Sequence, residues 1–367
     1  MARVCAGLLL LGVGLWLWAP RHAPPVRSMA ELAPPERMML MDLGLCDHAS
    51  NNATRRGAPR APRRLGASER VAAEPAYARA FWGRVAFPSD GVPPFEINTH
   101  DPVAQDVYIS ASVHRGARWD PFLWTLLAYL LAAPAALAPF AAPPVAVVVD
   151  VGANLGYFSL MAAALGHRVV AFEPMGRNAA KLQASIARNA GFSERIALYQ
   201  NAVASRAGEV VALAATHPSN QGNGQVVVRD APPRGGGALG GVYGIDYVET
   251  VRLDDVVAED VLVMKIDIEG LEAEALNGAR GLLCGHVVRY VVIEFSEETR
   301  RSARCPARRM LRTLEALGYA ISDIILGAAP LAADDDEVVY PPNLLFTLVN
   351  ASVAPGRRGA TPCVFSE

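Results

Sequence analysis

The residues with the clearest chemical meaning follow a mostly β-branched run at residues 145–149, which ends in the carboxylate of Asp150. The next residues place Gly152, Asn154 and Gly156 at alternate positions, in the pattern D-x-G-x-N-x-G. A glycine-bearing turn between a buried strand and a helix holds nucleotide-like ligands at the carboxyl edge of a parallel sheet. Glycine suits such a turn because a Cβ would block the ligand or forbid a positive φ.

The spacing of these residues differs from G-x-G-x-x-G, the pattern that seats the pyrophosphate of a dinucleotide on a helix N-terminus. The difference favours S-adenosylmethionine, which has no pyrophosphate. We expect Asp150 to bond the backbone N–H groups of the turn or to face the amino group of the ligand, because an unpaired buried carboxylate is costly. Asn154 is expected either to satisfy backbone groups of the loop or to touch the ligand.

More polar residues fall at the ends of later strands. Glu173 ends the second expected strand, where a carboxylate can accept from both hydroxyls of a ribose. The alternative for Glu173 is an ordinary surface glutamate before a helix. Asn201 and Ala202 lie toward the end of the third strand, near the position expected for the adenine. These residues complete the predicted cofactor site together with Asp267.

An acidic group follows the fourth and fifth strands. Asp267 and Glu269 lie at a strand-to-helix turn. This is the face where a substrate that accepts the methyl group of S-adenosylmethionine must meet that group. The alternative is that Asp267 caps the following helix while Glu269 favours its dipole. Glu294 ends the fifth strand and joins this edge. Three carboxylates can hold a divalent cation, but no histidine joins them at ligand spacing, so we predict no metal.

Alternating strand-like and helix-like segments must position these residues. Strands are expected at 145–150, 168–172, 196–204, 261–266, 287–293, 319–325 and 344–350, with helices at 154–165, 176–190, 271–282 and 307–317. The alternation predicts an α/β fold: a doubly wound, Rossmann-like, mostly parallel seven-stranded sheet with helices on both faces. Segments 209–215, 225–229 and 247–253 predict a small antiparallel insert, which can shape an acceptor pocket beside the ligand crevice.

The amino terminus is predicted to be a targeting segment. Residues 1–20 are expected to form an apolar helix that is a signal anchor or signal peptide, since residues 4–19 are uncharged and mostly apolar. The run is longer than a signal-peptide core and shorter than a plasma-membrane span, which suits thinner internal membranes. We expect the membrane as a partner, with the protein anchored in the secretory pathway on the lumenal face of the Golgi or ER. Secretion after cleavage and organelle targeting stay open.

The rest of the chain divides by composition. Residues 21–75, rich in Pro, Ala and Arg, predict a disordered stem. We expect lead-in helices at 76–144, the α/β domain at 145–352 and a tail at 353–367. Proline interrupts the apolar stretch 121–140, so it is predicted to be a buried helix and not a membrane span. Its apolar residues at helical spacing are Phe122, Leu126, Tyr129 and Leu130.

Composition excludes several classes of protein. A net charge of −2 gives no support for a nucleic-acid partner. The five cysteines lie far apart without a C-x-x-C pair, which argues against a zinc ribbon or a disulfide-dense scaffold. One or two disulfides are compatible with an oxidising lumen. The sequons at Asn52 and Asn350 fit lumenal exposure.

Six segments in this order resemble the FkbM-type methyltransferases, a branch of the class I S-adenosylmethionine-dependent enzymes. They are V-D-V-G-A-N-L-G at 149–156, V-V-A-F-E-P at 169–174, N-A-V at 201–203, R-L-D-D at 252–255, K-I-D-I-E-G at 265–270 and V-I-E at 292–294. The resemblance covers roughly residues 105–350, and residues 110–120 look like the lead-in helix of the family. It implies a methyltransferase domain at 145–352 that O-methylates a hydroxyl of a sugar, a glycan or a small metabolite.

An alcohol acceptor needs help in losing its proton. The candidate bases are Glu269, Asp267 and His217, in that order, although a lone loop histidine such as His217 is more often exposed to solvent. Two other functions stay open. A nicotinamide-dependent oxidoreductase requires G-x-G-x-x-G after the first strand, which this chain lacks. A non-catalytic, membrane-anchored scaffold with the same fold does not require the intact polar residues described above.

Overall fold

The computed structural model describes residues 61–66, 78–132, 145–215, 217, 219–220, 222–229, 243–295, 307–325, 330–331 and 342–349. The predicted anchor at 1–20, most of the predicted stem, both sequons and the tail lie outside these residues. Within the described ranges, no helix has the length and apolar character needed to cross a membrane.

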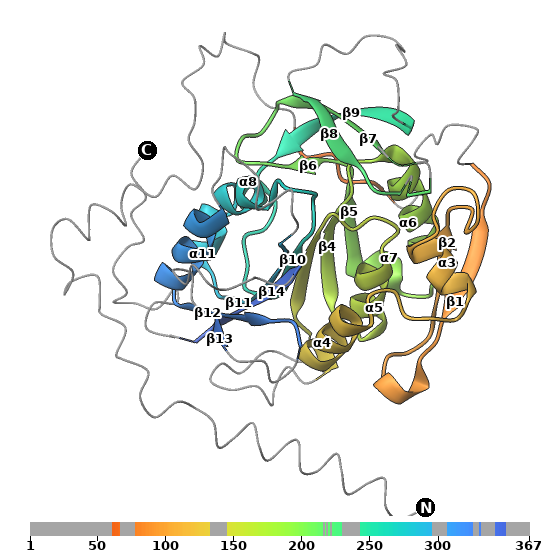
Figure 1. Cartoon of the computed structure of the whole chain (residues 1–367), viewed down its shortest axis with the longest axis horizontal. Coiled ribbons are helices and arrows are strands. Elements are labelled where there is room, and N and C mark those ends of the chain that lie inside the picture. The colour runs from red at the N-terminus through yellow and green to blue at the C-terminus, as the bar shows by residue number, and fades with distance from the viewer. Residues whose placement is uncertain are drawn as a thin grey trace, which may run out of the picture.

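A large mixed sheet forms the centre of the protein, with the strand order β13-β12-β14-β11-β10-β3-β4-β5 (Figure 1). Its parallel part consists of β5 (Ile196–Tyr199), β4 (Arg168–Phe172), β3 (Val147–Val151), β10 (Val261–Ile266) and β11 (Val288–Glu294). The antiparallel part consists of β14 (Asn343–Leu348), β12 (Tyr319–Asp323) and β13 (Pro330–Leu331). The mostly parallel α/β sheet is confirmed, but the predicted count of seven strands missed the two-residue edge strand β13.

Helices cover both faces of this sheet. Every residue of β3 and β10 is buried, as expected for parallel strands covered on both sides. On one face, Val149 packs in a core with residues of α8 (Glu272–Asn277), α9 (Arg280–Gly285) and α11 (Ala307–Ala316). On the other, Val148 packs with residues of α4 (Pro121–Ala132), α5 (Tyr157–Ala164), α6 (Gly176–Arg188) and α7 (Phe192–Arg195). Alternate residues of one strand thus serve two cores.

The predicted helix 271–282 is two helices, α8 and α9, which is a correction. A Cβ on Gly278 would lie 2.2 Å from the carbonyl oxygen of Ala204, so this position lies against the backbone of another segment. Asp254, in a short 3-10 turn at Leu253–Asp255, accepts from the backbone N–H of Gly281 at 3.0 Å and of Leu282 at 2.8 Å. This carboxylate satisfies the first turn of α9 and fixes where the second helix begins.

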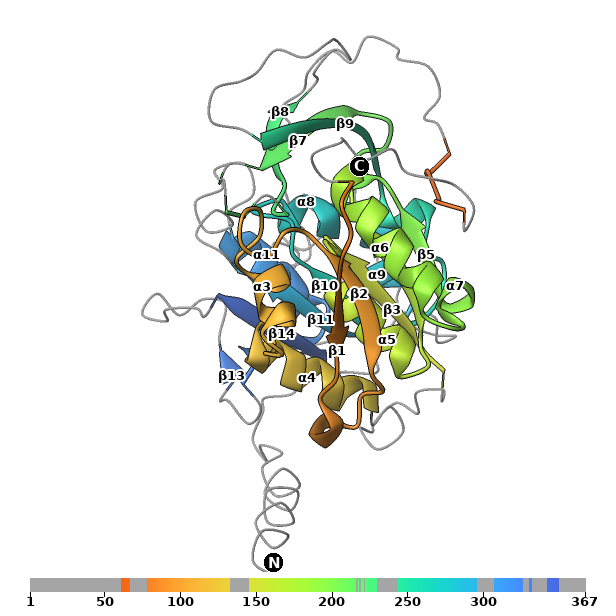
Figure 2. The same cartoon turned by 90° about the vertical axis from the view of Figure 1, so that its right-hand side faces the viewer.

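The lead-in segment is not purely helical, which also corrects the prediction. It contains an antiparallel hairpin, β1 (Phe81–Val85) and β2 (Phe95–Thr99), before α3 (Ile109–His114) and α4. The hairpin packs through β2 on α5 and α6, as Figure 2 shows. The buried helix within 121–140 is confirmed, but of its predicted apolar residues Phe122 is 61% and Tyr129 39% exposed.

Part of the predicted stem is ordered against the sheet. The backbone N–H of Leu65 donates to the carbonyl of Leu198 at 2.8 Å, and that of Gln200 donates to the carbonyl of Arg63 at 3.1 Å. β5 is the last strand of the sheet, and an edge strand offers unpaired backbone groups to a passing segment. The prediction of disorder is therefore wrong for residues 61–66.

The insert forms a second sheet with the order β6-β9-β7-β8, at the end of the central sheet where the parallel strands terminate (Figures 1 and 2). β7 (Val210–Ala215) pairs antiparallel with β8 (Gln225–Arg229) and with β9 (Tyr243–Val251), as predicted. The short strand β6 (Ala202–Val203) pairs parallel with β9. The predicted strand 196–204 therefore divides between the two sheets.

Candidate functional site

A cavity of about 330 Å³ opens where β3, β4, β10 and β11 end. Parallel strands bring their carboxyl ends to one edge, so residues far apart in the sequence meet there. The predicted site residues that line the cavity are Gly152, Asn154, Glu173, Asn201, Ala202, Asp267 and Glu269. Asp150, Gly156 and His217 are not among its lining residues.

The two glycines of the first turn have different roles. Gly152 has φ +81°, and a Cβ there would lie 1.9 Å from the carbonyl oxygen of Asp267. Gly156 has φ +83°, and a Cβ there would lie 2.1 Å from a methyl group of Leu182 on α6. Gly152 therefore lets the turn approach the end of β10, whereas Gly156 allows α5 to pack on α6. The packing of α5 on α6 is by itself enough to require glycine at position 156.

Asp150 binds side chains of the protein and does not reach the cavity. It is 2% exposed, and its Oδ2 accepts a hydrogen bond from Ser159 Oγ at 2.6 Å. Its Oδ1 lies 3.5 Å from Nζ of Lys265, which also lies 3.1 Å from Oδ2 of Asp267. Burial disfavours the ammonium group, but Asp267 and Asp150 outweigh burial and raise the pKa of Lys265. Lys265, which the sequence did not single out, thus links Asp150 to the cavity.

Replacing Lys265 by methionine should destabilise the protein by about 3–5 kcal/mol, because two carboxylates would lose their buried counter-charge. Urea denaturation of the variant measures this loss. Arg168→Met is the matched control, since Arg168 pairs with Glu259 at 2.8 Å on the surface. The control should lose less than about 1 kcal/mol. An equally small loss for the Lys265 variant would contradict the structural role given to this cation.

Glu173 is buried at the end of β4, with only 4% of its surface exposed. Its Oε2 accepts from the backbone N–H of Asn154 at 2.7 Å. Its Oε1 accepts from the backbone N–H of Met175 at 2.9 Å and from Nδ2 of Asn178 at 3.2 Å. Burial raises the pKa of Glu173 to about 7, although these donors oppose the shift. The alternative of an ordinary surface glutamate is therefore wrong.

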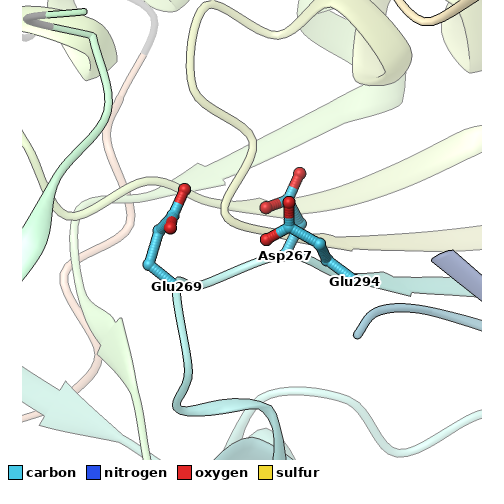
Figure 3. Close-up of side chains that lie close together, drawn as sticks. All are labelled: Asp267, Glu269 and Glu294. Atoms are coloured by element: carbon cyan, nitrogen blue, oxygen red, sulfur yellow. The ribbon is translucent and has the colours of Figure 1, made fainter. Parts of the chain in front are cut away.

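Asp267, Glu269 and Glu294 also line the cavity, and Figure 3 shows their side chains close together. Carboxylate oxygens of all three lie within 4.8 Å of one another, a set that also fits the ligands of a divalent cation. Burial and the charge of Asp267 raise the pKa of Glu269, while hydrogen bonds from Asn223 and Gln225 of the insert oppose the rise. Burial and the same aspartate raise the pKa of Glu294. Glu269 and Glu294 therefore keep their protons to a higher pH than ordinary carboxyl groups do.

The helix-capping role considered for Asp267 is wrong, because no side chain caps α8 with a hydrogen bond. A different carboxylate satisfies the turn that precedes this helix. Glu272 is fully buried, and its Oε1 accepts from the backbone N–H of Ile268 at 3.2 Å and of Gly270 at 3.0 Å. Helix α8 begins at Glu272, beyond both Asp267 and Glu269. Because Glu272 satisfies the turn, Asp267 and Glu269 keep their side chains at the cavity.

The remaining predicted residues divide between wall and surface. Asn201 lines the cavity, but its Oδ1 accepts from the backbone N–H of Arg63 at 2.8 Å and its Nδ2 donates to the carbonyl of Glu249 at 3.0 Å. Ala202 lines the same wall from β6. His217 is exposed, with Nδ1 3.0 Å from the hydroxyl of Ser219. The structure does not bring His217 to the other two base candidates.

Aromatic side chains form one wall of the cavity. This aromatic wall was not predicted from the sequence. Tyr108 and Trp119 of the lead-in segment meet edge to face at 5.9 Å. Tyr157 and Phe158 of α5 meet in the same way at 5.3 Å. Aromatic walls with a few convergent polar groups are typical of small-molecule sites. The only sequence signal was the clustering of aromatic residues before and after the glycine turn.

Residues 150–321 match the family model of the methyltransferase FkbM domain. No curated protein matches the chain. Among solved structures, the chain is similar to the crystal structure of methyltransferase FkbM from Methylobacillus flagellatus KT, with 17% identity and a TM-score of 0.35. The match covers 62% of this chain and 55% of that one, so the chain spans little more than half the length of this relative.

Proposed function

Because residues 150–321 belong to the methyltransferase FkbM family, we propose that this chain transfers the methyl group of S-adenosylmethionine to a hydroxyl oxygen. The acceptor in this proposal is a sugar, a glycan or a small metabolite. One observation carries it: the buried carboxylate of Glu173 faces the same cavity as Asp267 and Glu269. A diol-binding carboxylate and a group of proton acceptors are thus held within reach of one ligand.

The residues present fit the proposed cofactor. Glu173 offers two charged oxygens to the ribose hydroxyls, and Asn201 and Ala202 line the wall where the adenine would lie. Asn154 has a buried Oδ1 with no hydrogen-bond partner within the described part of the chain, and it lines the cavity. A volume of about 330 Å³ lies in the range of small-molecule sites. When bound, S-adenosylmethionine supplies a methyl group already activated by its sulfonium.

The protein must then align the acceptor and take its proton. Glu269 is the preferred base, because burial raises its pKa and it faces the cavity. Asp267 ranks second, since its Oδ2 lies 3.1 Å from the ammonium group of Lys265. His217, the third candidate, is exposed. The carboxylate of Glu269 would accept the proton that the acceptor hydroxyl loses when its oxygen is methylated.

The lining also bears on the acceptor. Asp267, Glu269 and Glu294 stand against the single cation Lys265 among the described residues that line the cavity. Burial and the charge of neighbouring carboxylates already raise the pKa of Glu269 and of Glu294, so an anionic acceptor would add a further negative charge where charge is disfavoured. The aromatic wall offers flat apolar surface to a ring. Both features favour a neutral hydroxylated acceptor such as an uncharged sugar.

We further propose that the protein is anchored in a membrane of the secretory pathway, with its body on the lumenal side. The apolar residues 4–19 support this location. Cys284, in α9, is disulfide-bonded, and disulfides are rare in reducing compartments. Alkylation of cysteines under non-reducing conditions, followed by mass spectrometry of protein from cells, tests whether Cys284 is protected.

Calorimetric titration of the full chain with S-adenosylmethionine tests the proposed function. We expect micromolar binding, and methyl transfer to neutral sugars in preference to uronic acids. A parallel titration with NADH should show no binding. A folded chain that binds neither ligand would leave the scaffold alternative in place, and binding of NADH alone would favour the oxidoreductase.

A further inference from the structure

The side-chain partner of Glu173 is itself held in one orientation. Asn178 lies in α6 and is 1% exposed. Its Nδ2 donates to Oε1 of Glu173 at 3.2 Å and to the carbonyl oxygen of Gly222 at 2.6 Å. Both partners are acceptors, so turning the amide over would place its oxygen against two other oxygens. The side chain thus joins the carboxylate to the insert loop only while its nitrogen faces them.

The other end of this amide faces a buried histidine. Oδ1 of Asn178 lies 2.8 Å from Nε2 of His100, which is fully buried. Burial, together with the nearby cations Lys181 and Arg177, lowers the pKa of His100 to about 3, so the ring is neutral. A neutral ring carries one proton, and Oδ1 can only accept. The proton therefore resides on Nε2 and points at Asn178.

His100 itself lies outside the matched residues, in the lead-in segment. It follows strand β2, and its backbone N–H donates to Ser110 Oγ at 3.2 Å. β2 is tied to α6, since the backbone N–H of Asn98 donates to Ser185 Oγ at 2.8 Å. The imidazole is thus fixed by the lead-in hairpin, whereas Glu173 and Asn178 belong to residues 150–321.

We propose that His100 is a positioning residue for the cofactor: its Nε2–H holds the Asn178 amide in the orientation that donates to Glu173. The lead-in hairpin then controls how well the carboxylate is presented to the ribose, and the bond to Gly222 places the insert loop with it. This inference rests on the proposed function, because the ribose is the group that Glu173 is proposed to bind. It assigns His100 no contact with the reacting atoms.

Calorimetry of the full chain with S-adenosylmethionine tests the proposal through four variants. His100→Leu keeps the bulk but removes the donor, and we expect its Kd to rise roughly tenfold, as for outer partners that orient metal ligands. His100→Gln, which offers an amide N–H in place of Nε2–H, should recover most of the affinity. Asn178→Ala should raise the Kd as much as His100→Leu does. The double variant should have the same Kd as either single variant, because each substitution breaks the same chain of hydrogen bonds from His100 through Asn178 to Glu173.

His167→Leu is the control for a purely structural effect. His167 is also buried, and its ring nitrogens face the backbone carbonyl of Leu131 and the N–H of Ala146, away from the cavity. This variant should lose stability but keep the wild-type Kd. Wild-type affinity in folded His100→Leu, or no rescue by glutamine, overturns the inference while the proposed function stands. If His100→Leu does not fold, an unchanged Kd in Asn178→Ala overturns it, and absence of binding by the wild type removes both proposals.

Discussion

Replacing Glu173 by glutamine should weaken the binding of S-adenosylmethionine by about 100-fold, or roughly 2.7 kcal/mol, because hydrogen bonds to a charged acceptor are each worth about 1.5–3 kcal/mol. The carboxylate already accepts from the backbone N–H groups of Asn154 and Met175. The glutamine side chain has only one oxygen. Its NH₂ group would therefore face one of these two backbone N–H groups, and two donors cannot bond to each other. Calorimetric titration gives the Kd directly.

Glu259→Gln is the matched control for this variant. Glu259 is exposed, pairs with Arg168 at 2.8 Å and does not line the cavity. The substitution therefore removes one negative charge and leaves the cavity unchanged. Its Kd should equal that of the wild type. A Glu173→Gln protein that is folded and binds within about threefold of the wild type would falsify the ribose assignment.

The same carboxylate predicts a pH dependence of binding. Its pKa in the free protein is raised to about 7, chiefly by burial and with a contribution from Asp246. The ionised form, which accepts from two hydroxyls, is therefore present above about pH 7 and is lost as the pH falls through that value. Affinity for S-adenosylmethionine should fall between pH 8 and 6 in the wild type and stay flat in Glu173→Gln. A flat wild-type profile would contradict the assignment.

Replacing Glu269 by glutamine should lower kcat by about 10²–10⁴-fold, the usual contribution of a positioned base, while the Kd for the cofactor changes little. Glutamine preserves the size of the side chain and one acceptor oxygen for Asn223 and Gln225, which bond to Glu269 in the wild type. Single-turnover transfer to a neutral sugar acceptor, measured beside calorimetry, separates the chemical step from binding.

Glu209→Gln controls for a change of charge in the insert. Glu209 pairs with Arg206 at 3.7 Å and does not line the cavity, so transfer should be unchanged. If Glu269→Gln keeps its kcat while Asp267→Asn loses it, the base is Asp267. If neither substitution lowers kcat, carboxylate assistance is wrong.

The positions of the polar residues along the chain were predictable for a simple reason. Each continuously apolar run had to be a buried strand, and parallel strands end at one edge. Glu173, Asp267 and Glu269 follow such runs, so they were expected at one site and line one cavity. The sequence therefore predicted the position of Glu173 at the end of its strand. It did not predict the two backbone N–H groups that donate to Glu173.

Neighbouring residues of one type could not be told apart in this way. Gly152 and Gly156 share a positive φ, and only packing separates a close approach to Asp267 from a close approach to Leu182. Asp267, Glu269 and Glu272 are all close enough in sequence to bond the same turn, and in the fold Glu272 accepts from its backbone N–H groups. Local preference is similar for all of these candidates, so contacts across the fold decide between them.

The sequence by itself determined the order of strands and turns, the parallel α/β class and the edge where the polar residues collect, because these follow from apolar periodicity. Only the tertiary structure decided which side chains act on one another. Lys265 lies beside Asp150 because β10 and β3 pair in that register. His100 reaches Asn178 because the lead-in hairpin packs on α6. Partners of this kind depend on register and on the packing of distant segments, which no local pattern encodes.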